Sequence, residues 1–370
     1  MPYPQFDRHA VKMLPLSSRT NKTQIEVDHV PVDQPAEDLS EVARRTIDEA
    51  VTRIVAARRA GAPVMLTFGA HTIKNGLSLV LAQLMERGWL THLATNGAGI
   101  IHDWEFAYQG QSAEDVAHYV ARGQFGNWQD TGFNINLALN VGAYEGKGYG
   151  ESVGALIENE GLDIPSADAL QAEVVENVAS DPARSARAAD LLSIVKRFEL
   201  PAGRLEVPHP WKRFSVQGAA YRLGVPLTGH PMFGHDIIYN HPMNNGASLG
   251  RAAERDFLTF AESVSRLSGG VYLSIGSAVM SPMVFEKSLS ITQNVAIQQG
   301  RRIENHSIYI VDLAKSNWDW SQGEPPQDDP AYYLRYNKSF SRMGGQMRYV
   351  TADNRDFLLQ LCHSLPESAN

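Results

Sequence analysis

Five polar clusters in this 370-residue chain contain side chains that can do chemistry, and each follows a short apolar run. Their histidines and carboxylates can exchange protons, a lysine can hold an anion, and small residues leave backbone amides open to a ligand. The clusters are residues 69–74 with His71 and Lys74, residues 96–103, residues 230–241, Gly276-Ser277, and residues 312–319. Parallel strands end at one edge of a sheet, so the five clusters are expected to converge there.

The clearest elements that position these clusters lie within residues 62–108. Residues 63–68 form a short apolar run, as in a strand that is buried on both faces, and residues 90–94 are predicted as the second strand. The helix between them ends at Gly88 and is predicted by apolar residues at helical spacing, namely Ile73, Leu77, Val80, Leu81 and Leu84. With a loop at 96–99 and a following helix, this stretch predicts a β-α-β unit.

Strands and helices alternate along the rest of the chain as well. Residues 112–122 read as a short helix and residues 201–211 as a loop. Further strands, with helices between them, are expected at 225–228, 270–275, 306–313 and 346–350. The alternation predicts an α/β fold of the Rossmann-like, doubly wound type, with a mostly parallel sheet and helices on both faces.

The domain organisation follows from the same reading. Residues 1–37 contain five prolines and no helical period, so we expect an N-terminal arm on the body or on a neighbouring subunit. Residues 38–370 are expected to form a single α/β domain of nucleotide-binding type.

Charge and composition narrow the class of protein. The net charge of −8 disfavours a nucleic-acid binder, and a small-molecule substrate is the expected partner. No apolar run reaches the roughly 20 residues of a membrane helix, and the first residues do not read as a signal peptide. Cys362 is the one cysteine, so no intrachain disulfide can form and a reducing compartment fits. We expect a cytoplasmic protein without membrane contact.

Several of the polar residues have a second interpretation. Lys74 can be a solvated lysine, and His102 with Asp103 can be a pair that only fixes a loop. Zinc ligands or ordinary loop residues are both open interpretations of His230, His235, His241 and Asp236, whose spacing matches no H-E-x-x-H motif. The chain also has no P-loop and no strict G-x-G-x-x-G motif. The residues alone therefore predict a nucleotide-binding type of α/β protein and leave its chemistry open.

Seven segments follow the order of one known family from about residue 38 to 365. They are Lys74-Asn75-Gly76, residues 95–99 (TNGAG), Val225-Pro226-Leu227, residues 234–239 (GHDIIY), residues 276–279 (GSAV), Ile308-Tyr309-Ile310 and residues 349–353 (YVTAD). These segments resemble those of deoxyhypusine synthase. The resemblance implies NAD as cofactor, a homo-oligomer (dimer or tetramer) with sites between subunits, and a lysine that forms an imine with an aminobutyl group after NAD has oxidised the amine.

The resemblance and the strand ends together imply the site residues. The imine-forming lysine falls at Lys338, and His102 with Asp103 forms the polar catalytic pair. Cofactor contacts are expected at Gly69, His71, Lys74, Asn96, Gly97, Gly276, Ser277, Asp312 and Asp353. Substrate contacts are expected at His235, Asp236, Asp319 and Tyr336, and no metal is expected.

The sequence departs from that family where substrate and cofactor would bind. His102 stands in place of an acidic residue, and Ala70 and His71 stand in place of a serine and an asparagine. The acidic residues with which that family holds the ammonium groups of its substrate spermidine have no clean equivalents in this chain. Losing them would weaken binding of a polycation. We expect an NAD-dependent transferase that moves an alkylamine-type group, with a substrate other than spermidine. Two alternatives remain: a metal-dependent hydrolase or lyase that uses the His/Asp cluster, and a non-catalytic nucleotide-binding scaffold.

Overall fold

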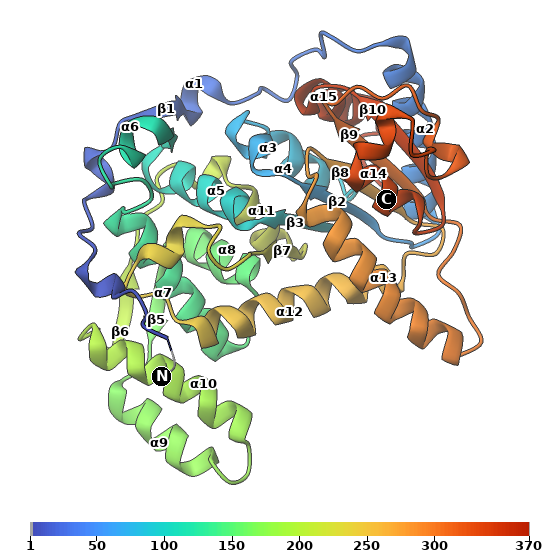
Figure 1. The fold of residues 1–370 in the computed structure, drawn as a ribbon. Helices are drawn as coiled ribbons and strands as arrows, with labels where there is room; N and C mark the ends of the chain where they lie inside the picture. Colours follow the sequence, from blue (N-terminus) through green and yellow to red (C-terminus); the bar gives the residue numbers. More distant parts are fainter. Residues whose placement is uncertain (1–2, 370) are drawn as a thin grey trace.

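A six-stranded parallel sheet forms the centre of the computed structural model, which describes residues 3–369 (Figure 1). Its strand order is β10-β9-β8-β2-β3-β7, and every neighbouring pair is parallel. The strands are β2 Val64–Phe68, β3 His92–Asn96, β7 Leu227–His230, β8 Val271–Ile275, β9 Ser307–Asp312 and β10 Gln346–Thr351. The predicted doubly wound α/β fold is confirmed.

The chain reverses its direction of progress across the sheet between β2 and β8. The first three strands of the sheet, β2, β3 and β7, step outward to one edge, and β8, β9 and β10 then step outward to the other. In each half, consecutive strands are joined by segments that contain helices, as parallel pairing requires. In sheets of this order, dinucleotides bind at the carboxyl ends of the two central strands, where the order reverses.

Helices cover both faces of the sheet, and this burial explains the apolar strands. All five residues of β2 and all five of β8 are buried. Neighbouring residues of β2 serve different cores, because side chains alternate along a strand: Leu66 packs with one hydrophobic cluster and Met65 with the other. The first core includes α2 Glu41–Arg59, α4 Ser78–Glu86 and α15 Asn354–Ser364, and the second includes α12 Gly246–Ser265, α13 Met280–Gln298 and α14 Arg335–Ser341.

The predicted helix between β2 and β3 is divided into α3 Ala70–Lys74 and α4. Gly76 separates them with a φ of +77°, a conformation that glycine adopts without strain. A Cβ at Gly76 would lie 2.3 Å from the carbonyl oxygen of Asp28. The N-terminal arm therefore packs directly on this break. The loop expected at 96–99 is also corrected, since α5 Gly97–Gln109 begins immediately after Asn96, whose side chain caps it by accepting from Gly99 N at 2.9 Å.

The N-terminal arm lies on the body of the same chain. Its elements are η1 Arg8–Ala10, η2 Leu16–Ser18, β1 Asn21–Gln24 and α1 Ile25–Asp28, and residues 1 and 2 of the expected arm lie outside the described residues. β1 pairs antiparallel with β4 Gln111–Glu114. The helix expected at 112–122 is therefore wrong in its first half: β4 comes first, and only α6 Val116–Val120 is helical. The partner strand that overrides the local pattern is about ninety residues away in the chain, as Asn21 pairs with Glu114.

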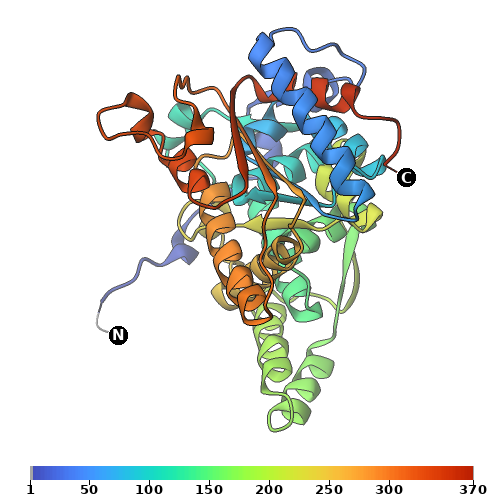
Figure 2. The same cartoon turned by 90° about the vertical axis from the view of Figure 1, so that its right-hand side faces the viewer.

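A helical region extends from the edge of the sheet that carries β7 (Figures 1 and 2). It consists of α7 Gln129–Glu145, α8 Tyr149–Asn159, α9 Ala167–Asn177 and α10 Pro182–Arg197, followed by α11 Val216–Leu223. The loop expected at 201–211 contains β6 Gly203–Glu206, which pairs antiparallel with β5 Gly161–Ile164. The short helices η3 Lys212–Phe214, η4 Ile237–Asn240, η5 Trp320–Gln322 and η6 Pro330–Tyr333 complete the described chain, in which no helix is long and apolar enough to cross a membrane.

Candidate functional site

The two central strands end in glycines that pack backbone against backbone. A Cβ at Gly69 would lie 2.1 Å from the carbonyl oxygen of Gly276, and Gly69 N donates to Ile275 O at 3.1 Å. Gly276 has a φ of +56° and is exposed, while the buried Ser277 accepts from Ser281 N at 3.3 Å at the start of α13. These two turns lie at the carboxyl ends of β2 and β8, where the strand order reverses, and their glycines place no side chain between the two strand ends. Three predicted cofactor residues, Gly69, Gly276 and Ser277, are thus brought together.

A cavity of about 190 Å³ lies beside this edge of the sheet. It collects residues from the arm, α3, α5, β4 and the loop after β7: Arg19, Lys74, Ala98, Ile101, His102, Glu105, Ala113, Glu114, Val116, Phe125, His235, Asp236 and Ile237. We call it the His102 pocket. Four residues that the sequence analysis singled out, Lys74, His102, His235 and Asp236, come together here from three separate segments of the chain.

His102 is held in one tautomer by a chain of buried hydrogen bonds. Its Nδ1 lies 2.7 Å from the hydroxyl oxygen of Ser112, and that hydroxyl donates to Glu105 at 2.6 Å. Because the single hydroxyl proton goes to the carboxylate, Nδ1 of His102 must donate, and Nε2 keeps its lone pair. Burial lowers the pKa of His102 to about 4, although Glu105 opposes the shift. His102 is therefore a neutral hydrogen-bond acceptor at pH 7.

Glu105 is held by the N-terminal arm. Arg19 donates to both carboxylate oxygens, at 2.8 and 2.6 Å, and Thr131 donates to one of them at 3.0 Å. Burial raises the pKa of Glu105, but the guanidinium outweighs it and the pKa lies below its usual value. Sequence reasoning missed Arg19, Glu105 and Ser112. The one local signal was that Glu105 follows His102 by three residues, which places both on one face of a helix.

Asp236 lies over the first residue of α5. A Cβ at Gly97 would be 2.2 Å from Oδ2 of Asp236, so only glycine admits the carboxylate here. Burial raises the pKa of Asp236 to about 6, and Tyr239 donates to it at 3.4 Å. The buried hydroxyl of Tyr149 has no hydrogen-bond partner among residues 3–369, and its pKa is raised by burial and by the charge of Asp236. A carboxylate that titrates near neutral pH therefore stands at a helix N-terminus beside the pocket.

Lys74 also faces a second groove, of about 380 Å³, on the other side of α3. This groove is lined by Lys22, Thr23, Asp28, Lys74, Asn75, Asp353 and Arg355. Asp353 accepts from Arg355 N at 2.8 Å and so caps α15, and Nε of Arg355 is buried without a partner in the described chain. The predicted cofactor residues Lys74 and Asp353 share this groove, and His71 is exposed nearby on α3.

Three further predicted residues lie toward the β9 and β10 edge. Asp312 ends β9, and burial, with the nearby Asp312, raises the pKa of Tyr336. The hydroxyl oxygens of Tyr336 and Tyr349 are 3.2 Å apart. Asp319 is exposed and accepts from Ser321 and Gln322 within its own turn. None of these residues lines the His102 pocket.

Asp103 points away from its neighbour His102. It is fully buried and accepts from Ser215 Oγ at 2.6 Å, Val216 N at 2.9 Å and both nitrogens of Gln217. Burial raises its pKa, and these donors oppose the shift. Asp103 therefore anchors the start of α11, and the predicted pairing of its carboxylate with His102 is corrected.

Lys338 also lies outside the His102 pocket. It is on α14, which packs against α13 and β10. Its Nζ is 2.9 Å from Oε1 of Glu324 and 3.2 Å from the centre of the Tyr332 ring. Desolvation opposes the charge, but the contacts with Glu324 and Tyr332 outweigh it and raise the pKa of Lys338. Within one chain, the structure does not bring Lys338 to Gly97, and its part as an imine-forming lysine stays a prediction.

The histidines of the metal alternative have separate partners. Nε2 of His230 lies 2.9 Å from the Thr228 hydroxyl, and His241 accepts from Met243 N at 3.0 Å. His235 is exposed at the mouth of the His102 pocket. Across residues 3–369, no three histidine, cysteine or carboxylate side chains are grouped to hold a metal ion.

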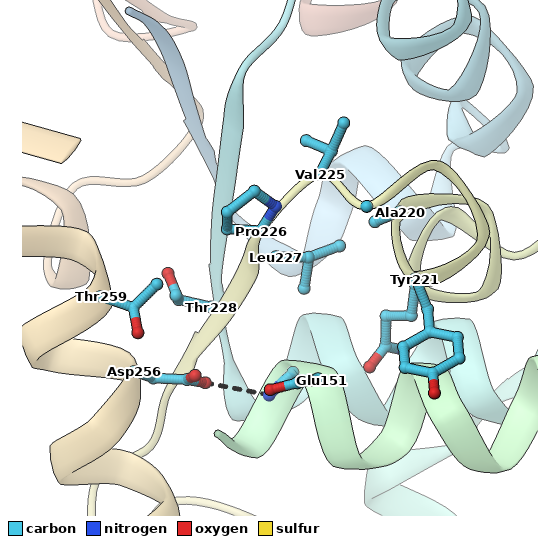
Figure 3. A pocket seen from close by; sticks show the side chains of 12 residues that line it. Glu151, Ala220, Tyr221, Val225, Pro226, Leu227, Thr228, Asp256 and Thr259 are labelled. Atoms are coloured by element: carbon cyan, nitrogen blue, oxygen red, sulfur yellow. Dashed lines mark hydrogen bonds between the residues drawn. The ribbon is translucent and has the colours of Figure 1, made fainter. Parts of the chain in front are cut away.

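Another cavity, of about 270 Å³, lies at the outer side of β7 between α8, α11 and α12 (Figure 3). Its most buried charged residue is Asp256, which accepts from Gly150 N at 2.9 Å and Gly229 N at 2.6 Å. Burial raises the pKa of Asp256 to about 7. These bonds join the start of α8 to the edge strand, and no residue proposed for the site from sequence lines this cavity.

No protein-family model and no curated protein sequence matches the chain. Among solved structures, it is similar to AgrE in a ternary complex with ornithine and NAD⁺, at 14% identity and a TM-score of 0.43 over 88% of this chain and 34% of AgrE. It is also similar to ArgZ, an arginine dihydrolase from the ornithine-ammonia cycle in cyanobacteria, at 13% identity and a TM-score of 0.40 over 89% of this chain and 33% of ArgZ.

A third match belongs to the family that the sequence resembles. It is a candidate deoxyhypusine synthase from Entamoeba histolytica, at 10% identity and a TM-score of 0.37 over 85% of each chain. The present chain spans about a third of the length of AgrE and ArgZ. At these identities the matches assign no substrate or activity to it.

Proposed function

We propose that this protein is an enzyme that binds NAD at the ends of β2 and β8 and oxidises a small polar substrate in the His102 pocket. One observation carries the proposal: the strand order reverses at Gly69 and Gly276, and α3, which starts directly after Gly69, places Lys74 in a cavity that also holds a neutral histidine and a carboxylate of pKa about 6. Strand order predicts where a dinucleotide binds, and the cavity adds groups that can act on a second molecule.

The turns after the central strands fit such a cofactor. Gly69 packs directly against the carbonyl of Gly276, a Cβ at Gly276 would meet nothing closer than 3.9 Å, and Ser277 and Lys74 add a hydroxyl and a cation at the same edge. Lys74 faces both the second groove and the His102 pocket, so it can contact an anionic group of cofactor or substrate. NAD, when bound, supplies the acceptor for a hydride.

The pocket residues supply the proton chemistry. Asp236, with a pKa of about 6, is mostly ionised at pH 7 and can take the proton of a substrate N–H or O–H group. His102 presents the lone pair of Nε2 and can orient such a donor, because Ser112 and Glu105 hold the ring. Loss of a hydride from the substrate carbon and of a proton to Asp236 leaves a C=N or C=O bond. A later transfer through an imine at Lys338 is a separate step that this half-reaction does not require.

Calorimetric titration with NAD⁺ tests the cofactor. We expect binding in the micromolar to millimolar range that Lys74→Gln weakens and Lys287→Gln, on the exposed surface of α13, leaves unchanged. Absence of binding at millimolar NAD⁺ would overturn the proposal. Asp236→Asn and His102→Gln should retain NAD binding and lose the reduction of NAD⁺ by candidate amines and alcohols. NAD binding with no turnover of any such substrate would favour the non-catalytic scaffold.

A further inference from the structure

A groove of about 540 Å³ lies away from the His102 pocket, between the end of α7, α10 and α12. Figure 1 shows these three helices side by side, and their contacts agree. The groove is lined by Ala143, Gly146, Lys147, Ala183, Arg187, Arg251, Glu254, Arg255, Leu258, Thr259 and Glu262. Four of these side chains are basic and two are acidic, in a chain whose net charge is −8.

Two of the arginines converge on one point from different helices. A Cβ at Gly146, which has a φ of +84°, would lie 3.4 Å from Nη2 of Arg255 and 4.0 Å from Nη1 of Arg187. Arg187 belongs to α10 and Arg255 to α12. Both guanidinium groups therefore approach the backbone turn that ends α7. Like charges on neighbouring side chains repel one another, so an anion bound between them would be favoured.

Within residues 3–369, neither guanidinium forms a salt bridge or hydrogen bond, and Nε of Arg187 is buried without an acceptor. The other two cations of the groove are paired, Lys147 with Glu145 at 2.5 Å and Arg251 with Asp190 at 3.3 Å.

The nearby carboxylates are engaged elsewhere or exposed. Glu173, whose pKa Arg187 helps to lower, accepts from Arg184 and Tyr144, each at 2.7 Å. Glu262 pairs with Arg266 at 3.5 Å, and Glu254 is exposed. Arg187 is half-buried and Arg255 is exposed, and within the described residues neither guanidinium forms an ion pair or hydrogen bond with a carboxylate.

We propose that this groove binds a phosphate-bearing small molecule between Arg187 and Arg255. A guanidinium offers a planar fork of donors that matches two oxygens of a phosphate, and two forks can hold one dianionic group. The free hydroxyl of Thr259 and the paired Lys147 lie along the same groove, whose volume leaves room for an attached organic part. The proposal is independent of the NAD site, because the two sites share no residue.

Titration of the full chain with inorganic phosphate and with pyrophosphate, at low ionic strength, tests this site. We expect Arg187→Gln and Arg255→Gln each to weaken binding about tenfold or more, as loss of a charge-assisted hydrogen bond implies. Arg301→Gln, at an exposed position after α13, is the matched control and should bind as the unchanged protein does. Added salt should weaken binding in the unchanged protein.

Thermal unfolding gives a second readout that separates binding from folding. Without phosphate, both arginine variants should unfold at or above the temperature of the unchanged protein, because a repulsion is removed. Phosphate should raise that temperature in the unchanged protein and in the Arg301 variant only. Equal binding by all three variants, or no binding at millimolar phosphate and pyrophosphate, would overturn the proposal. So would binding that Lys74→Gln abolishes and the arginine variants retain, since the anion would then occupy the proposed cofactor site.

Discussion

Arg19 of the N-terminal arm and Glu105 of α5 form a two-point ion pair, with N–O distances of 2.8 and 2.6 Å. Both side chains are 1% exposed. The pair fixes the carboxylate that holds Ser112, and Ser112 in turn holds His102. The arm is therefore part of the pocket wall, and the orientation of His102 depends on a residue 83 positions earlier in the sequence.

Replacing Arg19 by methionine should destabilise the protein by about 3–5 kcal/mol, because Glu105 is left buried without its counter-charge. Denaturant unfolding measures the change. Lys22→Met is the control, since Lys22 forms only an exposed pair with Asp115, and it should change the stability little. A loss in Arg19→Met no larger than in the control would mean that the pair does not hold the arm. Arg19→Met with Glu105→Met should recover part of the loss.

Acid should destabilise the fold as the pH falls below about 6.5. Burial lowers the pKa of His92 and His230 to about 3, and of His102, His209 and His241 to about 4. Between these values and 6.5 the unfolded chain binds more protons than the folded one, so stability decreases with falling pH. Asp236 and Asp256 oppose this effect, because their raised pKa values, about 6 and about 7, let the folded state bind more protons than the unfolded chain. They are fewer than the five histidines.

Thermal unfolding at a series of pH values from about 7.5 to 4, roughly the range in which the protonation of the histidines differs between the folded and unfolded states, checks this expectation. His230→Gln should flatten the dependence, because one buried neutral histidine is removed. His118→Gln, at an exposed position on α6, should keep the slope of the unchanged protein. A melting temperature that rises on acidification would show that the carboxylates outweigh the histidines.

Gly97→Ala should disturb Asp236 specifically. The added Cβ would lie 2.2 Å from Oδ2 of Asp236, so the carboxylate must move from the start of α5. We expect the pKa of Asp236, about 6 in the unchanged protein, to fall toward the ordinary value as the group becomes hydrated. Carbon-13 NMR of labelled aspartates, assigned with Asp236→Asn, measures it. Gly250→Ala, where a Cβ meets nothing within 4 Å, is the control. The same pKa in both alanine variants would contradict the tight contact.

Glu324→Gln should make Lys338 more reactive. Glu324 and Tyr332 keep the lysine protonated, and a fall of one pKa unit raises the fraction of free amine about tenfold below the pKa. Labelling with an amine-reactive ester near neutral pH, followed by peptide mass spectrometry, should find Lys338 modified several-fold faster in the variant. The exposed Lys315 in the same samples serves as the internal reference. Unchanged labelling of Lys338 would mean that Glu324 does not control its charge.

Local patterns were sufficient for much of the fold. The apolar run at β2 reads correctly as a strand buried on both faces, and the strands expected near β7, β8, β9 and β10 are present. The alternation of strands and helices predicted a parallel, doubly wound sheet, because parallel strands need a helix-length connection. Local patterns failed at β4 and β6, since each of these short strands exists only through pairing with a segment distant in the sequence.

The sequence by itself also determined that polar clusters would lie at one sheet edge, and Lys74, His102 and Asp236 do meet there. Only the tertiary structure decided which side chains face each other. His102 and Asp103 are neighbours in the chain, yet successive residues on a helix point about 100° apart, so one enters the pocket and the other anchors α11. The ion pair of Arg19 with Glu105 spans 86 residues, and no local pattern encodes a contact that depends on how the arm packs against α5.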